Sequence, residues 1–172
     1  MAQQQLSATE AARRLVAGEQ MKTVFGVTET QIKGIVALGY NQYDQGKLQD
    51  AEKAFRGVTA LDSTSYFGYA GLGAVALAKR PPDLETAHLN LTKAAELKPD
   101  DATIQANLGE VLLRQGKVED AKEHLEKAFR LDPGHKDPGV NRARAIVSGL
   151  DTIVREVEKR LQAQQARPAK AS

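Results

Sequence analysis

The sequence contains no cysteine, few aromatic residues and no long apolar run. Without cysteine there is neither a disulfide framework nor a thiolate metal site, and the cytosol is the natural compartment for such a chain. No apolar segment approaches the length of a membrane span. The first residues lack the basic start and the apolar run of a secretory signal. We therefore expect a cytoplasmic protein that does not associate with a membrane.

Aromatic residues account for only 5% of the chain, whereas hydrophobic residues account for 41%. A core must therefore be built mainly from Ala, Leu and Val. The charge is nearly balanced, because 24 Lys and Arg residues face 22 Asp and Glu residues and the formal net charge is +2. Arg167 and Lys170 account for that excess, which leaves the body of the chain formally neutral. Nucleic acid is therefore not an expected partner.

A short pattern recurs three times along the chain: Leu-Gly, then Ala, then a large apolar residue. Its glycines, Gly39, Gly73 and Gly109, lie 34 and 36 residues apart. Gly and Ala at matched places let two antiparallel helices approach closely, while the large apolar side chains fill the space beside them. The spacing is that of tetratricopeptide repeats, and the resemblance to this family covers residues 29–134. We predict three helical hairpins in this range.

Glycine and proline mark the ends of the predicted helices. Gly46 and Gly116 supply the left-handed residue that ends the first helix of hairpins one and three. Pro99 and Pro133 follow second helices and cannot continue them, because proline has no backbone donor. The second hairpin has a longer turn, over residues 79–83. The short turns at Gly46 and Gly116 favour antiparallel helices that stack as an array.

Helices are also predicted on both sides of the repeats. Residues 1–28 form an N-terminal helical region, in which residues 7–10 fit a capping box. Asp137 and Pro138 start a C-terminal helix over residues 135–165, and residues 166–172 form a disordered tail. That helix either caps the open end of the array or also pairs with a second chain. Its apolar residues recur with a heptad-like spacing, at Ala143, Ile146, Leu150, Ile153 and Val157.

The predicted fold class is therefore all-α: a right-handed superhelical tetratricopeptide-repeat solenoid of three helical hairpins with flanking helices. No catalytic constellation accompanies it. His88, His124 and His135 fall at unrelated places in the pattern, so their spacing suggests no metal triad. The glycines around Gly71 lack the Gly-Lys-Ser/Thr element of a phosphate loop. We expect no catalytic residue, no cofactor, no metal site and no enzymatic activity.

In such arrays the first helices line a concave face that commonly holds an extended peptide. The pattern predicts a mostly apolar peptide-binding face, made of Val36, Tyr40, Tyr43, Phe67, Ala70, Ala74, Leu77, Ala106, Glu110 and Leu113. Tyrosine suits this role because it offers a large apolar area and a hydroxyl group. A site for the acidic tails of heat-shock chaperones would need several Lys, Arg and Asn residues, and only Asn107 is present. We expect an apolar ligand whose binding depends little on salt.

Within the repeat family, the N-terminal half resembles a narrower group. The segments 21–28, 35–43 and 45–56 look like the class II chaperones of bacterial type III secretion, the SycD/LcrH group. The resemblance implies a small cytosolic chaperone that holds secreted, pore-forming translocator proteins before export. Its groove would accept an extended translocator segment. The resemblance also implies a possible homodimer, with its contact around Leu6, Ala11 and Leu15.

Two other functions remain open from the sequence. The chain could be a general tetratricopeptide-repeat scaffold that uses the same groove for an unrelated peptide. It could also be mainly an oligomeric structural module in which the terminal helices dominate.

Overall fold

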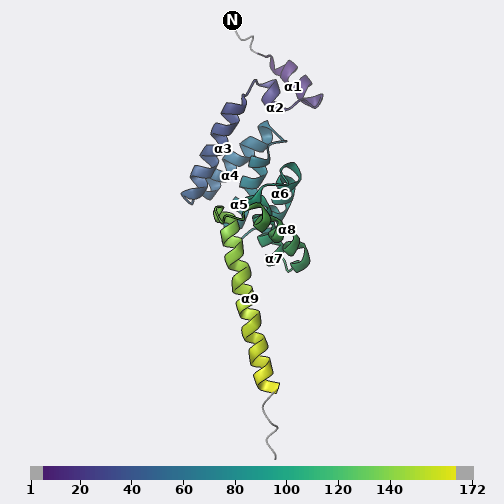
Figure 1. The fold of residues 1–172 in the computed structure, drawn as a ribbon. Coiled ribbons are helices and arrows are strands. Elements are labelled where there is room, and N and C mark those ends of the chain that lie inside the picture. The colour runs from purple at the N-terminus through teal and green to yellow at the C-terminus, as the bar shows by residue number, and fades with distance from the viewer. Residues whose placement is uncertain (1–5, 166–172) are drawn as a thin grey trace, which may run out of the picture.

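The computed structural model describes residues 6–165 and the side chains of residues 6–162, and this part of the chain forms nine helices and no strand (Figure 1). Two helices precede the repeats, namely α1 (Ala8–Val16) and α2 (Met21–Val24). The three hairpins are α3 (Glu29–Asp44) with α4 (Leu48–Leu61), α5 (Tyr66–Ala78) with α6 (Leu84–Leu97), and α7 (Ala102–Arg114) with α8 (Val118–Leu131). The last helix is α9 (Pro138–Gln165). The predicted all-α solenoid is confirmed, and the predicted tail over 166–172 lies outside the described residues.

The hairpins stack in chain order, because α4 packs on α5 and α6 packs on α7 (Figure 1). The first helices α3, α5 and α7 also contact their neighbours directly, and they form the inner layer of the array. Within the described residues, no helix combines the length and the apolar character needed to cross a membrane.

Local signals set the helix ends as the sequence predicts. Thr28 and Gln31 form a reciprocal capping box at the start of α3. Of the capping box predicted at residues 7–10, the structure shows one half, in which the Ser7 side chain accepts a hydrogen bond from the Glu10 N–H at the start of α1. Gly46 and Gly116 adopt positive φ angles of 74° and 77° after α3 and α7. The left-handed conformation turns the chain sharply, so each second helix begins within a few residues.

The repeat glycines allow the helices to approach closely. A Cβ atom on Gly39 would lie 2.8 Å from Cε1 of Phe55, and a Cβ atom on Gly109 would lie 2.6 Å from Cγ of Leu125. Gly71, on the next first helix, also faces the Phe55 ring. Phe55 is fully buried. Because its ring packs against Gly39 of hairpin one and Gly71 of hairpin two, it holds the two hairpins together.

Two buried aspartates attach the flanking helices to the array. At the end of α4, Asp62 accepts a hydrogen bond from Lys22 of α2, with 2.6 Å between Nζ and Oδ2. At the end of α8, Asp132 forms an ion pair with Arg144 of α9, with 3.0 Å between Nη1 and Oδ2. Arg144 also lies over the Phe129 ring. The backbone N–H of Lys136 and the Arg144 guanidinium hold the pKa of Asp132 below its usual range. Each end of the array is therefore tied by a charged hydrogen bond.

Only the first turns of α9 cover the last repeat. Val140 and Ala143 are buried against α7 and α8, and Val147 packs beside them. Leu150, Ile153 and Val157 are exposed, because α9 extends beyond the array as a single helix (Figure 1). Of the five apolar residues predicted to recur along this helix, Ala143 covers the last repeat, whereas Leu150, Ile153 and Val157 do not, because α9 is longer than the surface that it covers.

The glycine contacts predict opposite effects of one substitution at two helical sites. Gly109→Ala should lower the free energy of unfolding by about 1 to 3 kcal/mol through overpacking against Leu125. Gly57→Ala, in α4 where no atom lies within 4 Å of the added Cβ, should raise it by about 0.5 to 1 kcal/mol. Urea unfolding followed by circular dichroism measures both. Equal effects at the two sites would contradict the repeat packing.

A pair of truncations tests the capping part of α9. A chain that ends after Ser148 keeps Val140, Ala143, Val147 and Arg144, so it should melt close to the full chain. A chain that ends after Asp137 exposes the apolar side of α7, so it should melt at a lower temperature and aggregate. Thermal unfolding and light scattering compare the two. Equal stability would show that α9 does not cap the array.

Candidate functional site

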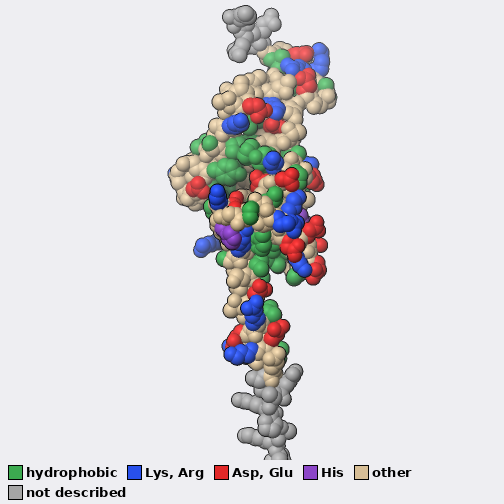
Figure 2. Space-filling model, in the orientation of Figure 1, with side chains coloured by type: hydrophobic (Ala, Val, Ile, Leu, Met, Phe, Trp, Pro, Cys, Tyr) green, Lys and Arg blue, Asp and Glu red, His purple; other side chains and the backbone are tan. Residues whose placement is uncertain are grey.

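The concave face holds two adjoining cavities. The first, of about 230 Å³, lies between α3, α5 and α7. Its walls are mostly apolar and comprise Tyr40, Tyr66, Phe67, Ala70, Ala74 and Ile104, with Asp101, Thr103 and Asn107 on one side. On the face shown in Figure 2, hydrophobic side chains gather over the region of α3, α4 and α5. The first cavity is suited to an apolar side chain.

Aromatic contacts hold the walls of this apolar cavity. The ring of Tyr40 meets Phe55 edge to face, with 5.0 Å between ring centroids. Tyr66 and Phe67 stack with their centroids 4.0 Å apart. Burial, together with the negative charge of Asp101, raises the pKa of Tyr40 to about 12. The Tyr40 hydroxyl therefore stays protonated at neutral pH and can donate a hydrogen bond to a ligand carbonyl.

The second cavity, of about 390 Å³, has a different character. Four of its lining side chains are basic and one is acidic, and the lining comprises Tyr43, Leu77, Ala78, Lys79, Arg80, Pro82, Glu110, Arg114 and Arg142. Lys79 is paired with Glu52, at 2.9 Å. The basic groups nevertheless outnumber the acids, so this end of the face favours a negatively charged or carbonyl-rich ligand.

A buried glutamate organises the basic cavity. Glu110 is only 4% exposed, and its carboxylate accepts hydrogen bonds from Arg114 at 2.7 Å and from Arg142 at 3.0 Å. Arg142 also donates to Oδ1 of Asn107, at 2.8 Å. Because Asn107 lines the apolar cavity as well, this network connects the two cavities. The arginines are thus fixed by α7 and by the start of α9.

The predicted site residues fall into two sets. Seven of them line the cavities: Tyr40, Phe67, Ala70 and Ala74 line the first, and Tyr43, Leu77 and Glu110 line the second. The other three pack into the protein. Val36 and Ala106 are buried, and Leu113 is half-buried against the core of the last two hairpins. The structure therefore brings together most of the set, although not all of it faces solvent.

The basic side chains were missed by the sequence pattern. Arg142 comes from α9, and Lys79 and Arg80 come from the turn before α6, so a pattern restricted to first helices omits all three. The run Lys79-Arg80-Pro81-Pro82 in the longest turn was the available signal for this cluster.

Another cavity, of about 460 Å³, lies elsewhere, between α6, α7 and α8. Its lining includes the buried Gln105. Gln105 donates to the Pro99 carbonyl at 2.8 Å and lies 2.7 Å from Nδ1 of His124. Burial lowers the pKa of His124. No cluster of potential metal ligands is present among the described residues.

Comparisons with known proteins agree with this architecture. Residues 83–147 match the tetratricopeptide repeat family. The chain is 30% identical over 100 residues to the bovine DnaJ homolog subfamily C member 3, covering 58% of this chain but only 19% of that protein. It is 28% identical over 105 residues to the low calcium response locus protein H of Yersinia pestis, covering 61% of each chain. The chain thus spans about a fifth of the first relative and under two thirds of the second.

A solved structure shares the fold over most of this chain. It is PcrH, a protein of Pseudomonas aeruginosa, in complex with the chaperone binding region of PopD. The TM-score is 0.62 at 25% identity, and the match covers 74% of this chain and 96% of that chain. Part of the chain, residues 83–147, therefore matches the tetratricopeptide repeat, and the resemblance to the SycD/LcrH group is confirmed.

The raised pKa of Tyr40 predicts a pH dependence of stability. An unfolded tyrosine titrates near pH 10, whereas Tyr40 in the folded chain has a pKa of about 12. Its contribution to stability is therefore complete below pH 10 and is lost as the pH rises toward 12. Tyr40→Phe should reduce the fall in melting temperature across this range and remove the last step of an ultraviolet titration. Tyr69→Phe, outside the cavities, should keep that step.

Proposed function

We propose that this chain is a non-enzymatic, cytoplasmic chaperone that holds a translocator protein of type III secretion before export. The observation that carries the proposal is the pair of adjoining cavities on the concave face of a fold shared with PcrH. PcrH is a chaperone whose structure contains the chaperone binding region of PopD. A protein client with an extended segment is the partner that suits such a face.

In this proposal the client segment runs across the first helices. An apolar side chain enters the cavity beside Tyr40 and Phe67, and the next part of the segment passes Leu77 toward Glu110 and its arginines. Val36, Ala106 and Leu113 hold the helices in place and do not themselves contact the client. The basic cavity adds a requirement that the sequence pattern did not predict: the segment carries an acidic side chain, or exposed carbonyl groups, beyond its apolar anchor.

The physical requirements of such a chaperone fit this face. A translocator has apolar segments that aggregate in water, so a partner must cover them until export. An open groove can do this without enclosing the client. Ordering an extended segment costs conformational entropy, which keeps the affinity moderate and permits release. No chemical step is needed.

A peptide with the sequence of a translocator's chaperone-binding region tests the proposal. Tyr40→Ala combined with Tyr43→Ala should weaken its binding by roughly 2 to 4 kcal/mol, about 30- to 1,000-fold in Kd, because two aromatic anchors are lost. Leu38→Ala is the matched control, since Leu38 lies on the same helix, is 53% exposed and lines neither cavity. Calorimetry measures the affinity, and circular dichroism verifies that the helices persist.

Two outcomes of the same titration would count against the proposal. Unchanged affinity in the double variant would place the peptide outside the cavities. Loss of nearly all affinity on raising the salt concentration would show that charge alone drives binding, as expected for a general scaffold with an unrelated acidic ligand. The apolar cavity predicts instead that most of the affinity survives high salt.

A further inference from the structure

The apolar face of α9 continues past the array that it covers. Apolar side chains recur alternately three and four residues apart along the helix, at Val140, Ala143, Val147, Leu150, Val154, Val157 and Leu161. The first three pack against the last two hairpins. The last four are between 45% and 54% exposed, and the part of the helix that carries them projects away from the array (Figure 1). These seven residues form one apolar seam with heptad spacing. The array covers the first three residues of the seam and leaves the last four exposed.

We propose that residues 150–161 of α9 pair antiparallel with the same residues of a second copy of this chain. The four exposed seam residues read Leu, Val, Val, Leu, and they are separated by four, three and four residues. Both the residue types and the spacings are the same in either direction. An interface between two identical chains related by a two-fold axis requires such a self-complementary pattern.

The antiparallel register matches side chains of equal size. Leu150 lies opposite Leu161 of the partner subunit, and Val154 lies opposite Val157 of the partner subunit. The axis then passes midway between Val154 and Val157. The paired stretch is about 17 Å long at 1.5 Å per residue. Ile153, which is 61% exposed, adds apolar area beside the seam.

The array itself excludes the parallel arrangement on this face. In a parallel pair, residues 138–147 of the second copy would lie opposite Val140 and Ala143. These two side chains are already buried against the last repeat, so that space is occupied. In the antiparallel arrangement the two arrays lie at opposite ends of the paired helices. Arg142 and the concave face then remain accessible, so pairing is compatible with ligand binding.

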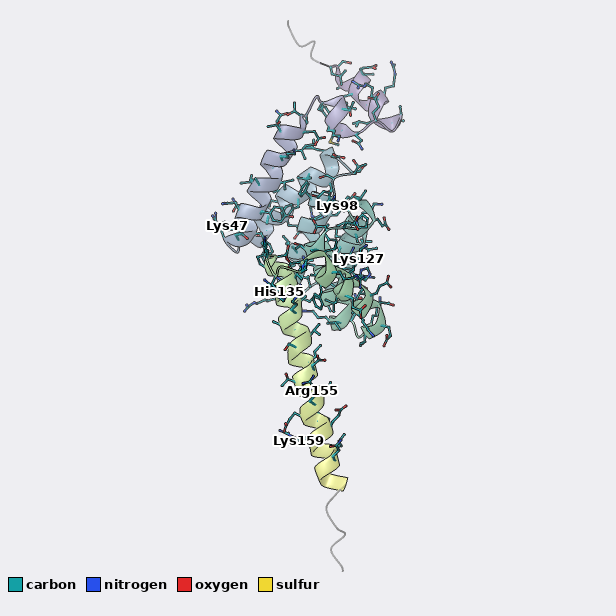
Figure 3. The ribbon with its side chains drawn as sticks, in the orientation of Figure 1. Lys47, Lys98, Lys127, His135, Arg155 and Lys159 are labelled. Carbon is teal, nitrogen blue, oxygen red and sulfur yellow. The ribbon has the colours of Figure 1, made fainter. Side chains whose placement is uncertain are left out.

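The charges of the projecting segment favour a second copy over a strongly charged partner. Residues 150–162 carry three acidic and three basic side chains, so two copies do not repel each other overall. Arg155 and Lys159 point outward from the projecting part of α9 (Figure 3), and Glu156 pairs with Arg160 along the helix at 3.1 Å. Beside the seam, Asp151 lies near Glu158 of the partner subunit. Repulsion between these two carboxylates lowers the affinity of the two copies for each other.

The first experiment measures the mass of the full chain over a range of concentrations by sedimentation equilibrium. We expect a reversible dimer. Val154→Glu places a charge in the seam and should raise the dimer Kd at least tenfold. Thr152→Glu is the matched control, because it adds the same charge on the opposite side of the helix and should leave the Kd within about twofold. A monomer at every concentration, or a dimer that Val154→Glu leaves intact, would overturn the proposal.

The second experiment tests the direction of pairing and uses the absence of cysteine from the chain. Leu150→Cys and Leu161→Cys chains are oxidised separately and as a mixture, with circular dichroism as a check of folding. Antiparallel pairing predicts a disulfide-linked dimer in the mixture, because residues 150 and 161 are opposed. Each chain alone should remain largely unlinked, since equivalent positions are about 17 Å apart along the axis. Efficient linkage of either chain alone would exclude the proposed register.

Discussion

Phe55 lies fully buried between α3 and α5, where Gly39 and Gly71 present backbone to its ring. This contact sets the distance between the first two hairpins, and the Leu125 contact with Gly109 does the same within the third. Because the helices approach so closely, α3, α5 and α7 form a continuous inner layer. The two cavities of the concave face are hollows in this layer, so their shape depends on the glycine contacts behind it.

Much of the fold could be predicted from the sequence because its signals are local and repeated. The repeat glycines and the left-handed Gly46 act within one helix or one turn. Seven of the ten predicted face residues line a cavity for the same reason, since a helix of known period has predictable sides. Periodicity could not distinguish a residue that lines a cavity, such as Ala74, from one that is buried, such as Ala106.

What the sequence did not predict depends on contacts between distant residues. Glu110 accepts a hydrogen bond from Arg142, which lies 32 residues later in the chain. Glu110 belongs to a repeat helix and Arg142 to the flanking helix α9, so the repeat pattern does not predict their contact. The extent of the cap on α9 is a similar case. A heptad pattern continues to Leu161, but the covered part ends where the third hairpin ends. The position at which the third hairpin ends, and not the apolar pattern of α9, therefore determines which side chains of α9 are exposed to solvent.

The middle first helix, α5, is built largely from small residues. Ala70 and Ala74 form part of the apolar cavity, and Gly68, Gly71 and Gly73 turn toward the second helices. Over this stretch a ligand meets methyl groups and backbone, with few side chains that distinguish one residue type from another. Such a surface recognises the width and spacing of apolar groups more than their identity. Peptide segments that differ in sequence but share the spacing of their apolar groups could therefore fit the same groove.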